Sequence, residues 1–271
     1  MILFKKLNNI VGWTIFLIAS FVYLSTIEQT VSFWDCGEYI ATAYKLEVGH
    51  PPGAPLFQLF GRIFSLFATP GTSEVAIAIN TLSALCSSFT ILFLFWTITA
   101  FSKKIIIKNQ NINIEQTILI LSSGVIGSLA YTFSDSFWFS AVEGEVYAMS
   151  SLFTAATFWC IMKWEEESHK ASSGRWLILI AYLIGLSIGV HLLSLLTIPA
   201  MGMIYYFKKY QYTKSGAIKA FLITIGLLGL VQGVIIPGAV SLISKFELFF
   251  VNSIGLPFNS GAIIYLIAII C

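Results

Sequence analysis

Charge is scarce in this sequence. Asp, Glu, Lys and Arg together make up 10% of its 271 residues, against roughly 25% in an average soluble domain, while 57% of the residues are hydrophobic. This balance excludes an ordinary soluble domain and indicates an integral, multi-pass membrane protein built from α-helices. We expect membrane lipid around it and no nucleic-acid partner.

Cysteine is also sparse. The four cysteines are Cys36, Cys86, Cys160 and Cys271. Their spacing matches neither a zinc site nor a disulfide framework, and three of them lie within apolar runs, so we expect neither feature. The composition thus leaves catalysis and binding to other residue types.

Long apolar runs are abundant, and each run of about 20 residues is long enough to cross a bilayer. The predicted spans are 9–27, 75–101, 116–133, 146–162, 176–190, 192–207, 218–240 and an incomplete span at 261–271. No cleavage site follows the first run, so we expect an uncleaved span. We predict a single transmembrane domain over 1–271, the N-terminal fragment of a longer protein.

The segment 176–207 is too long for one span, and charge decides how it crosses. If it turns near Gly189–His191 and crosses twice, 12 of the 15 Lys and Arg residues lie on the side of the N-terminus. Cytoplasmic loops carry such an excess, so we predict a multi-pass protein with a cytoplasmic N-terminus. His191 then lies at the outer end of a short hairpin, which we predict to share a cavity with Asp35.

Acids sort to the opposite side, and the outer loop 28–74 holds several of them. Residues 33–46 are predicted to be helical, which puts Asp35, Glu38 and Tyr39 on one face. His50 precedes Pro51, which ends that helix.

Residues 55–68 form a second predicted helix of this loop. Gln58, Arg62 and Ser65 make a narrow polar stripe among Leu, Ile and Phe. We interpret this pattern as a helix that lies in the membrane interface.

Two further outer segments carry ionisable groups. Glu143 and Glu145 flank Gly144 just before the span 146–162, with Tyr147 beyond, and His191 marks the third segment. Each feature also has a purely structural interpretation: an N-cap for Asp35-x-x-Glu38, a favourable helix-end charge for Glu143 and Glu145, a hydrogen-bonded histidine, and a snorkelling Arg62. Their shared depth in the membrane nevertheless favours a functional site.

These motifs resemble a known family. The stretches FWDCGEYIATAYKLEVGHPPGAPL, AVEGEVYAMSSLF and GLSIGVHLL are similar to the bacterial protein O-mannosyltransferase-like family, which is related to a eukaryotic transmembrane protein O-mannosyltransferase. That family resembles the GT-C glycosyltransferases, which use polyprenyl-phosphate-linked sugars on the non-cytoplasmic face. The resemblance implies a GT-C-like helical bundle and a catalytic acid at Asp35.

The predicted activity is transfer of a mannose-like sugar from a polyprenyl-phosphate donor to a hydroxyl acceptor on a protein (Ser or Thr) or a glycan. Asp35 would act as general base and Glu38 would position it. The predicted substrate-binding residues are His50, Arg62, Glu143, Glu145, Tyr147 and His191. No metal motif is present, although Asp35, Glu143 or Glu145 could bind a divalent cation.

Two other classes of function stay open. A membrane transporter or lipid flippase would use helices broken near Gly189 and Pro237, but a proton-coupled transporter normally carries an acid near mid-membrane, and the predicted spans hold none there. A non-catalytic scaffold would tolerate Asp35→Asn.

Overall fold

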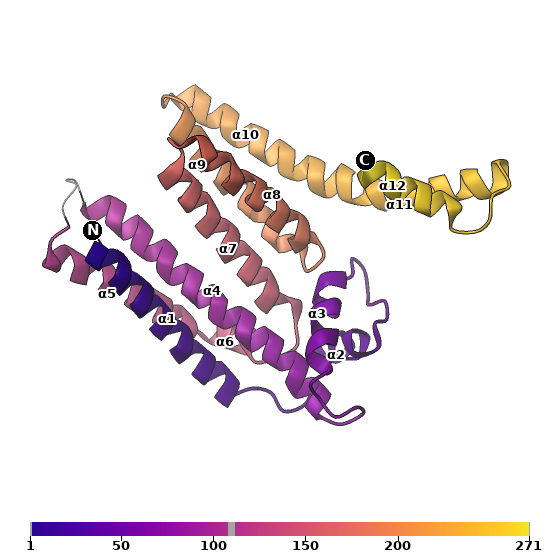
Figure 1. Ribbon diagram of the computed structural model, residues 1–271, viewed down its shortest axis with the longest axis horizontal. Helices are drawn as coiled ribbons and strands as arrows, with labels where there is room; N and C mark the ends of the chain where they lie inside the picture. The colour runs from indigo at the N-terminus through magenta and orange to yellow at the C-terminus, as the bar shows by residue number, and fades with distance from the viewer. Residues whose placement is uncertain (1, 108–111, 271) are drawn as a thin grey trace. The chain divides into compact units, whose positions relative to one another are not determined.

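The computed structural model describes residues 2–107 and 112–270; Lys108 of the predicted topology and Cys271 of the last predicted span lie outside that part. The described chain is helical and contains no β-strand. It divides into two units, Met1–Thr197 and Ile198–Cys271, which are described separately. Figure 1 shows the helices.

Within residues 2–107 and 112–270, five helical stretches are long and apolar enough to cross a membrane. They are Leu3–Ser25, Glu74–Ile106, Ile114–Thr132, Ala171–Ile188 and Lys214–Ser253. The expectation of an all-α polytopic membrane protein is therefore confirmed. The fourth stretch ends just before the expected turn at Gly189–His191. The last one is continuous in helix well beyond the expected span 218–240.

The first unit is organised around α4 (Glu74–Ile106), which packs between α1 (Ile2–Ser25) and α7 (Val146–Glu167), with α5 (Ile114–Thr132) beside it. Small hydroxyl residues let neighbouring helices approach α4 closely. Two of them, Ser88 and Thr90, are buried and donate to carbonyls one turn earlier in the same helix. Their polar groups are thus satisfied without a partner helix.

Two short helices sit at one end of α1, α4 and α7 (Figure 1). They are α2 (Cys36–Lys45) and α3 (Pro55–Ser65), joined by a turn that begins with Leu46 at a left-handed φ of 55°. A Cβ at Gly61 would lie 2.8 Å from the Ala43 side chain, so glycine allows α2 and α3 to pack closely. Phe57 is fully buried in the cluster that holds both helices against α4.

The polar stripe of α3 faces the protein. Gln58 and Ser65 are buried, whereas Leu59, Phe60 and Ile63 are about half exposed. The sequence identified a narrow polar stripe, and the structure shows that this stripe is the inner face. The apolar outer face of α3 is then available to lipid.

The remaining elements of the first unit are three short ones and the longer helix α8. They are α6 (Asp135–Ala141), the 3-10 turn η1 (Ala171–Ser173), α8 (Gly174–Ile188) and the 3-10 helix η2 (Leu192–Leu196). Gly189 separates α8 from η2, and its carbonyl accepts a hydrogen bond from the Leu56 backbone N–H (2.7 Å). This bond fixes the turn at 189–191 against the start of α3.

The second unit begins within α9 (Thr197–Lys209) and continues with α10 (Lys214–Leu230), the π-helical η3 (Val231–Ile235) and α11 (Ile236–Leu248). The π-helical η4 (Phe249–Ser253) and α12 (Ser260–Ile270) follow. Pro237 lies in the first turn of α11. A proline in this position leaves the fewest backbone groups without a hydrogen bond, because the N–H groups of a first turn have no partner within their own helix. The π-turn accommodates this proline, and the helix is not interrupted there.

Candidate active site

Three segments far apart in sequence meet at one end of the helices of the first unit. The Glu28 backbone N–H donates to the Val142 carbonyl (3.1 Å), which joins the end of α1 to the α6–α7 connection. The bond between Leu56 and Gly189 joins the outer loop to the turn after α8, and the rings of Tyr147 and His191 lie 5.3 Å apart. Loop 28–74, the acidic pair and the His191 turn are therefore neighbours.

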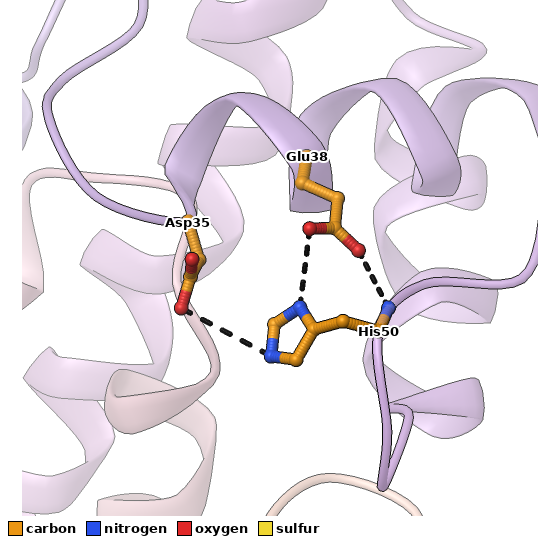
Figure 2. Close-up of side chains that lie close together, drawn as sticks. All are labelled: Asp35, Glu38 and His50. Carbon is orange, nitrogen blue, oxygen red and sulfur yellow. Dashed lines mark hydrogen bonds and ion pairs between the residues drawn. The ribbon is translucent and has the colours of Figure 1, made fainter.

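At the centre of this end lie two carboxylates and an imidazole (Figure 2). Asp35 and Glu38 are one turn apart at the start of α2, and His50 lies in the connection between α2 and α3. Glu38 accepts the His50 backbone N–H at 2.6 Å and contacts the ring Nδ1 at 3.1 Å. The Nε2 atom of the same ring is 4.0 Å from an oxygen of Asp35. The imidazole therefore bridges the two carboxylates.

The Glu38 carboxylate is held in place by its two contacts with His50. Hydrogen bonds from the His50 backbone and side chain hold the pKa of the Glu38 carboxyl below its ordinary value. Its carboxylate orients the ring that faces Asp35.

Asp35 is not a helix cap in the usual sense. It occupies the N-cap position of α2, yet its side chain makes no capping hydrogen bond. The preceding residue, Trp34, has a left-handed φ of 69°, which is unfavourable for a bulky side chain. The backbone thus turns sharply just before Asp35. The capping interpretation does not describe what this carboxylate does.

Glu143 and Glu145 lie beside this cluster and are almost fully buried, at 4% and 2% exposure. The Ser32 hydroxyl donates to the Glu143 carboxylate, and burial raises the Glu143 pKa. Burial, helped by the charges of Glu143 and Asp35, raises the pKa of Glu145 to about 7, although it accepts a hydrogen bond from the Asp35 backbone N–H. Glu145 occupies the N-cap position of α7, and its side chain makes no capping hydrogen bond.

Gly144 explains how two buried acids fit here. A Cβ at this position would lie 2.9 Å from the Asn80 side-chain oxygen and 3.0 Å from the Ile40 side chain. The absence of a side chain lets the acidic turn insert between α2 and α4.

Tyr39, which lies beside His50, and His191 complete the site. Tyr39 is buried, its ring centroid lies 5.6 Å from that of His50, and burial raises its pKa to about 12. His191 accepts the Leu193 backbone N–H at Nδ1 (3.2 Å), which leaves the proton of a neutral ring on Nε2. Burial lowers the pKa of His191 and so favours that neutral form.

Arg62, predicted to bind substrate, contacts the last turn of α2. Its guanidinium donates to the Tyr44 carbonyl (2.8 Å) and lies over the Tyr44 ring at 5.3 Å. It therefore holds the last turn of α2, about 13 Å of helix from Asp35. Its contacts in this structure are with the loop itself.

Some residues of the site had only a faint sequence signal. Ser32, whose hydroxyl donates to Glu143, lies one residue before the first of the motif stretches. Asn80 is fully buried in α4 and donates to the Glu28 carbonyl (2.7 Å) and the Thr30 carbonyl (3.2 Å). A lone asparagine inside the predicted span 75–101 was the signal that could have identified it.

The central cluster also has the composition of a cation site. Asp35, Glu38 and His50 each offer one ligand atom, and these atoms lie within 4.8 Å of one another. Carboxylate oxygen and imidazole nitrogen are donors that several divalent metals accept. This set differs from the expected one of Asp35, Glu143 or Glu145.

Residues 35–214 match the family described as "Protein O-mannosyl-transferase TMEM260 N-terminal domain". The chain belongs to this family. The matched segment starts at Asp35 and contains every residue of the site except Ser32. Membership in an O-mannosyltransferase-like family, expected from the sequence, is thereby confirmed.

Two curated relatives carry the corresponding name. The chain is 30% identical to the protein O-mannosyl-transferase tmem260 of Dictyostelium discoideum over 52% of its own length and 15% of the relative's. It is 25% identical to the protein O-mannosyl-transferase TMEM260 of Mus musculus over 62% of its own length and 21% of the relative's. The chain thus spans a small part of each relative. No solved structure matches it.

Proposed function

We propose that this chain carries the catalytic end of a membrane glycosyltransferase of the GT-C type, which moves a mannose-like sugar from a polyprenyl phosphate to a hydroxyl acceptor, such as a protein Ser or Thr. The observation that carries the proposal is the Asp35 carboxylate. It stands 4.0 Å from the His50 ring and makes no capping bond, in a family whose relatives are named O-mannosyl-transferases.

Asp35 acts as the general base in this proposal. The acceptor oxygen forms its bond to the anomeric carbon while the bond from that carbon to the phosphate oxygen breaks. The hydroxyl proton passes to Asp35, and the electron pair leaves with the polyprenyl phosphate. Glu38 keeps the His50 ring beside Asp35, as its two contacts with His50 support.

The developing phosphate charge needs hydrogen-bond donors. His191, through its Nε2–H beside Tyr147, is the candidate that the contacts favour, whereas both ring nitrogens of His50 face carboxylates. Glu143 and Glu145 would bind the acceptor or the sugar hydroxyls, and Glu145, with a pKa of about 7, can also donate a proton. Where a divalent cation takes part, Asp35, Glu38 and His50 would hold it. Arg62 would support the loop.

The location follows from charge. Twelve of the 15 basic residues lie on the side of the N-terminus in the predicted topology. We therefore assign the N-terminus to the cytoplasm and the site to the outer face, where a lipid-linked donor and an aqueous acceptor can meet. A bacterial inner membrane fits this arrangement.

The decisive experiment is Asp35→Asn in the full-length protein, assayed with a polyprenyl-phosphate sugar and a hydroxyl acceptor. Turnover should fall by about 10²–10⁴-fold, the usual contribution of a general base, while thermal unfolding and donor affinity stay near wild type. Glu38→Gln should cost less, because Gln can still accept one hydrogen bond from His50.

The matched control is Glu47→Gln, which neutralises an exposed acid of the same loop whose nearest cation is Lys45 at 4.0 Å. It should leave turnover unchanged. Wild-type turnover for Asp35→Asn would end the proposed role of Asp35 and would favour a non-catalytic scaffold, since Asn caps a helix about as well as Asp.

A further inference from the structure

A polar cavity lies at the opposite end of the same helices from Asp35. It has a volume of about 890 Å³ and is bounded by the start of α1, the end of α4 and the end of α7 with the turn that follows. This volume is typical of a small-molecule site. Nothing in the proposed transfer reaction uses it.

The lining of this cavity is basic. Its two acids are Glu166 and Glu167. Its five lysines are Lys5, Lys103, Lys104, Lys163 and Lys170. Glu166 is shared between Lys163 (3.2 Å) and Lys103 (3.8 Å). Lys104 pairs with Glu165 and Lys170 with Glu167, so the five lysines face three carboxylates. Positive charge is therefore in excess, and an anion is the complementary ligand.

The cavity is also amphipathic. Trp13, Trp96 and Trp159 line it, and their rings contact one another edge-on or tilted at 6.2 Å and 5.8 Å. Tryptophan gathers where transmembrane helices meet the headgroup layer. Asn8 adds a side-chain oxygen that is screened from solvent and, among residues 2–107 and 112–270, has no hydrogen-bond partner. A hydroxyl-bearing headgroup would satisfy it.

We propose that this cavity binds an anionic glycerophospholipid, with the phosphate among the lysines and the glycerol backbone against the tryptophans. Basic pockets between transmembrane helices on the cytoplasmic side are suited to such headgroups. A free phosphorylated metabolite would satisfy the lysines but would leave the tryptophan wall without a ligand. The proposal is independent of the chemistry at Asp35.

The test uses the whole protein, purified in detergent, delipidated, and titrated with phosphatidylglycerol or phosphatidylcholine under native mass spectrometry. Phosphatidylglycerol should be retained and phosphatidylcholine should not. Lys5→Gln combined with Lys103→Gln should weaken phosphatidylglycerol binding by roughly 30-fold. The control pair, Lys214→Gln with Lys219→Gln, removes the same charge from α10 and should bind as wild type.

A second measurement does not depend on variants. Phosphatidylglycerol brominated on its acyl chains should quench tryptophan fluorescence of the wild-type protein more strongly than brominated phosphatidylcholine at equal concentration. Equal retention and equal quenching by the two lipids would overturn the proposal, as would an equal loss in the control pair. Displacement of the lipid by millimolar inorganic phosphate would point instead to a soluble phosphate ligand and would also overturn it.

Discussion

The two ends of α1, α4 and α7 use the same residue type in opposite ways. At the basic end, Glu167 accepts hydrogen bonds from Trp176 (3.1 Å), Lys170 (3.2 Å) and Arg175 (3.2 Å), which lower its pKa to about 2. At the acidic end, Glu145 is buried beside Glu143 and Asp35, and its pKa is about 7. One glutamate is saturated with donors, and the other is desolvated among acids.

This difference separates a structural charge from a functional one. A carboxylate surrounded by cations and N–H groups stabilises the fold and has no free capacity for a substrate. A carboxylate buried among other carboxylates opposes folding, so its presence calls for another explanation, and perturbed acids of this kind cluster at catalytic sites. The contrast supports a catalytic site around Asp35. At the lysine end it supports a surface that binds a ligand and transfers no proton.

The strongest test of this contrast is the pH dependence of stability. Between about pH 4.5 and pH 7 the folded protein binds a proton at Glu145 that the unfolded chain has released, so the free energy of unfolding falls as pH rises through this window. A pKa of about 7 in place of 4.5 corresponds to roughly 3 kcal/mol. Glu145→Gln should remove the part of this dependence that Glu145 contributes, while Glu143, whose pKa burial also raises, keeps its own.

Thermal unfolding in detergent at several pH values provides the measurement. The melting temperature of the wild type should drop more between pH 5 and pH 8 than that of Glu145→Gln, and the variant should be the more stable of the two at pH 8. Parallel curves would show that Glu145 is ionised in the folded protein throughout and would remove the contrast with Glu167.

Much of this arrangement follows from one-dimensional patterns. The partition of basic residues predicted that loop 28–74, the Glu143–Glu145 turn and His191 lie on the same side of the membrane. In the structure these three segments are in contact. Helical periodicity placed Asp35 and Glu38 on one face of the helix that became α2. Both inferences rest on local or additive signals.

The sequence could not show which face of a helix points toward the protein and which points toward lipid. The stripe of α3 has the same periodicity whether it turns toward lipid or protein, and only its packing on α2 and α4 sends Gln58 inward. Arg62 donates to the Tyr44 carbonyl, 18 positions earlier in the chain, and no sequence pattern indicates this contact. The Ser32–Glu143 bond likewise spans 111 positions, far beyond any sequence period.

A smaller effect is expected from the glycine that holds the acidic end together. Gly144→Ala would put a methyl group within 3.0 Å of Asn80 and Ile40, so α2 must move from α4, at a cost of about 2 kcal/mol. Turnover should fall as well, because displacement of Asp35 misaligns the base. Chemical or thermal unfolding and the transfer assay measure the two effects.

Gly185→Ala is the matched control, since nothing lies within 4 Å of a Cβ at that position of α8. It should be neutral or slightly stabilising in a helix. If both alanine variants behaved alike, the close approach at Gly144 would have no energetic importance.

The smallest effect is expected at the basic end. Glu166→Gln releases Lys103 and Lys163 from their shared carboxylate, which is about half exposed, so the free energy of unfolding should change by at most about 1 kcal/mol. The cavity loses a negative charge, and phosphatidylglycerol should bind a few-fold more tightly, with transfer by Asp35 unaffected. Native mass spectrometry measures the binding of phosphatidylglycerol, and the transfer assay, run on the same preparation, measures turnover. A large loss of turnover would mean that the two ends are coupled through α7, and the division between a catalytic and a lipid-binding end would no longer hold.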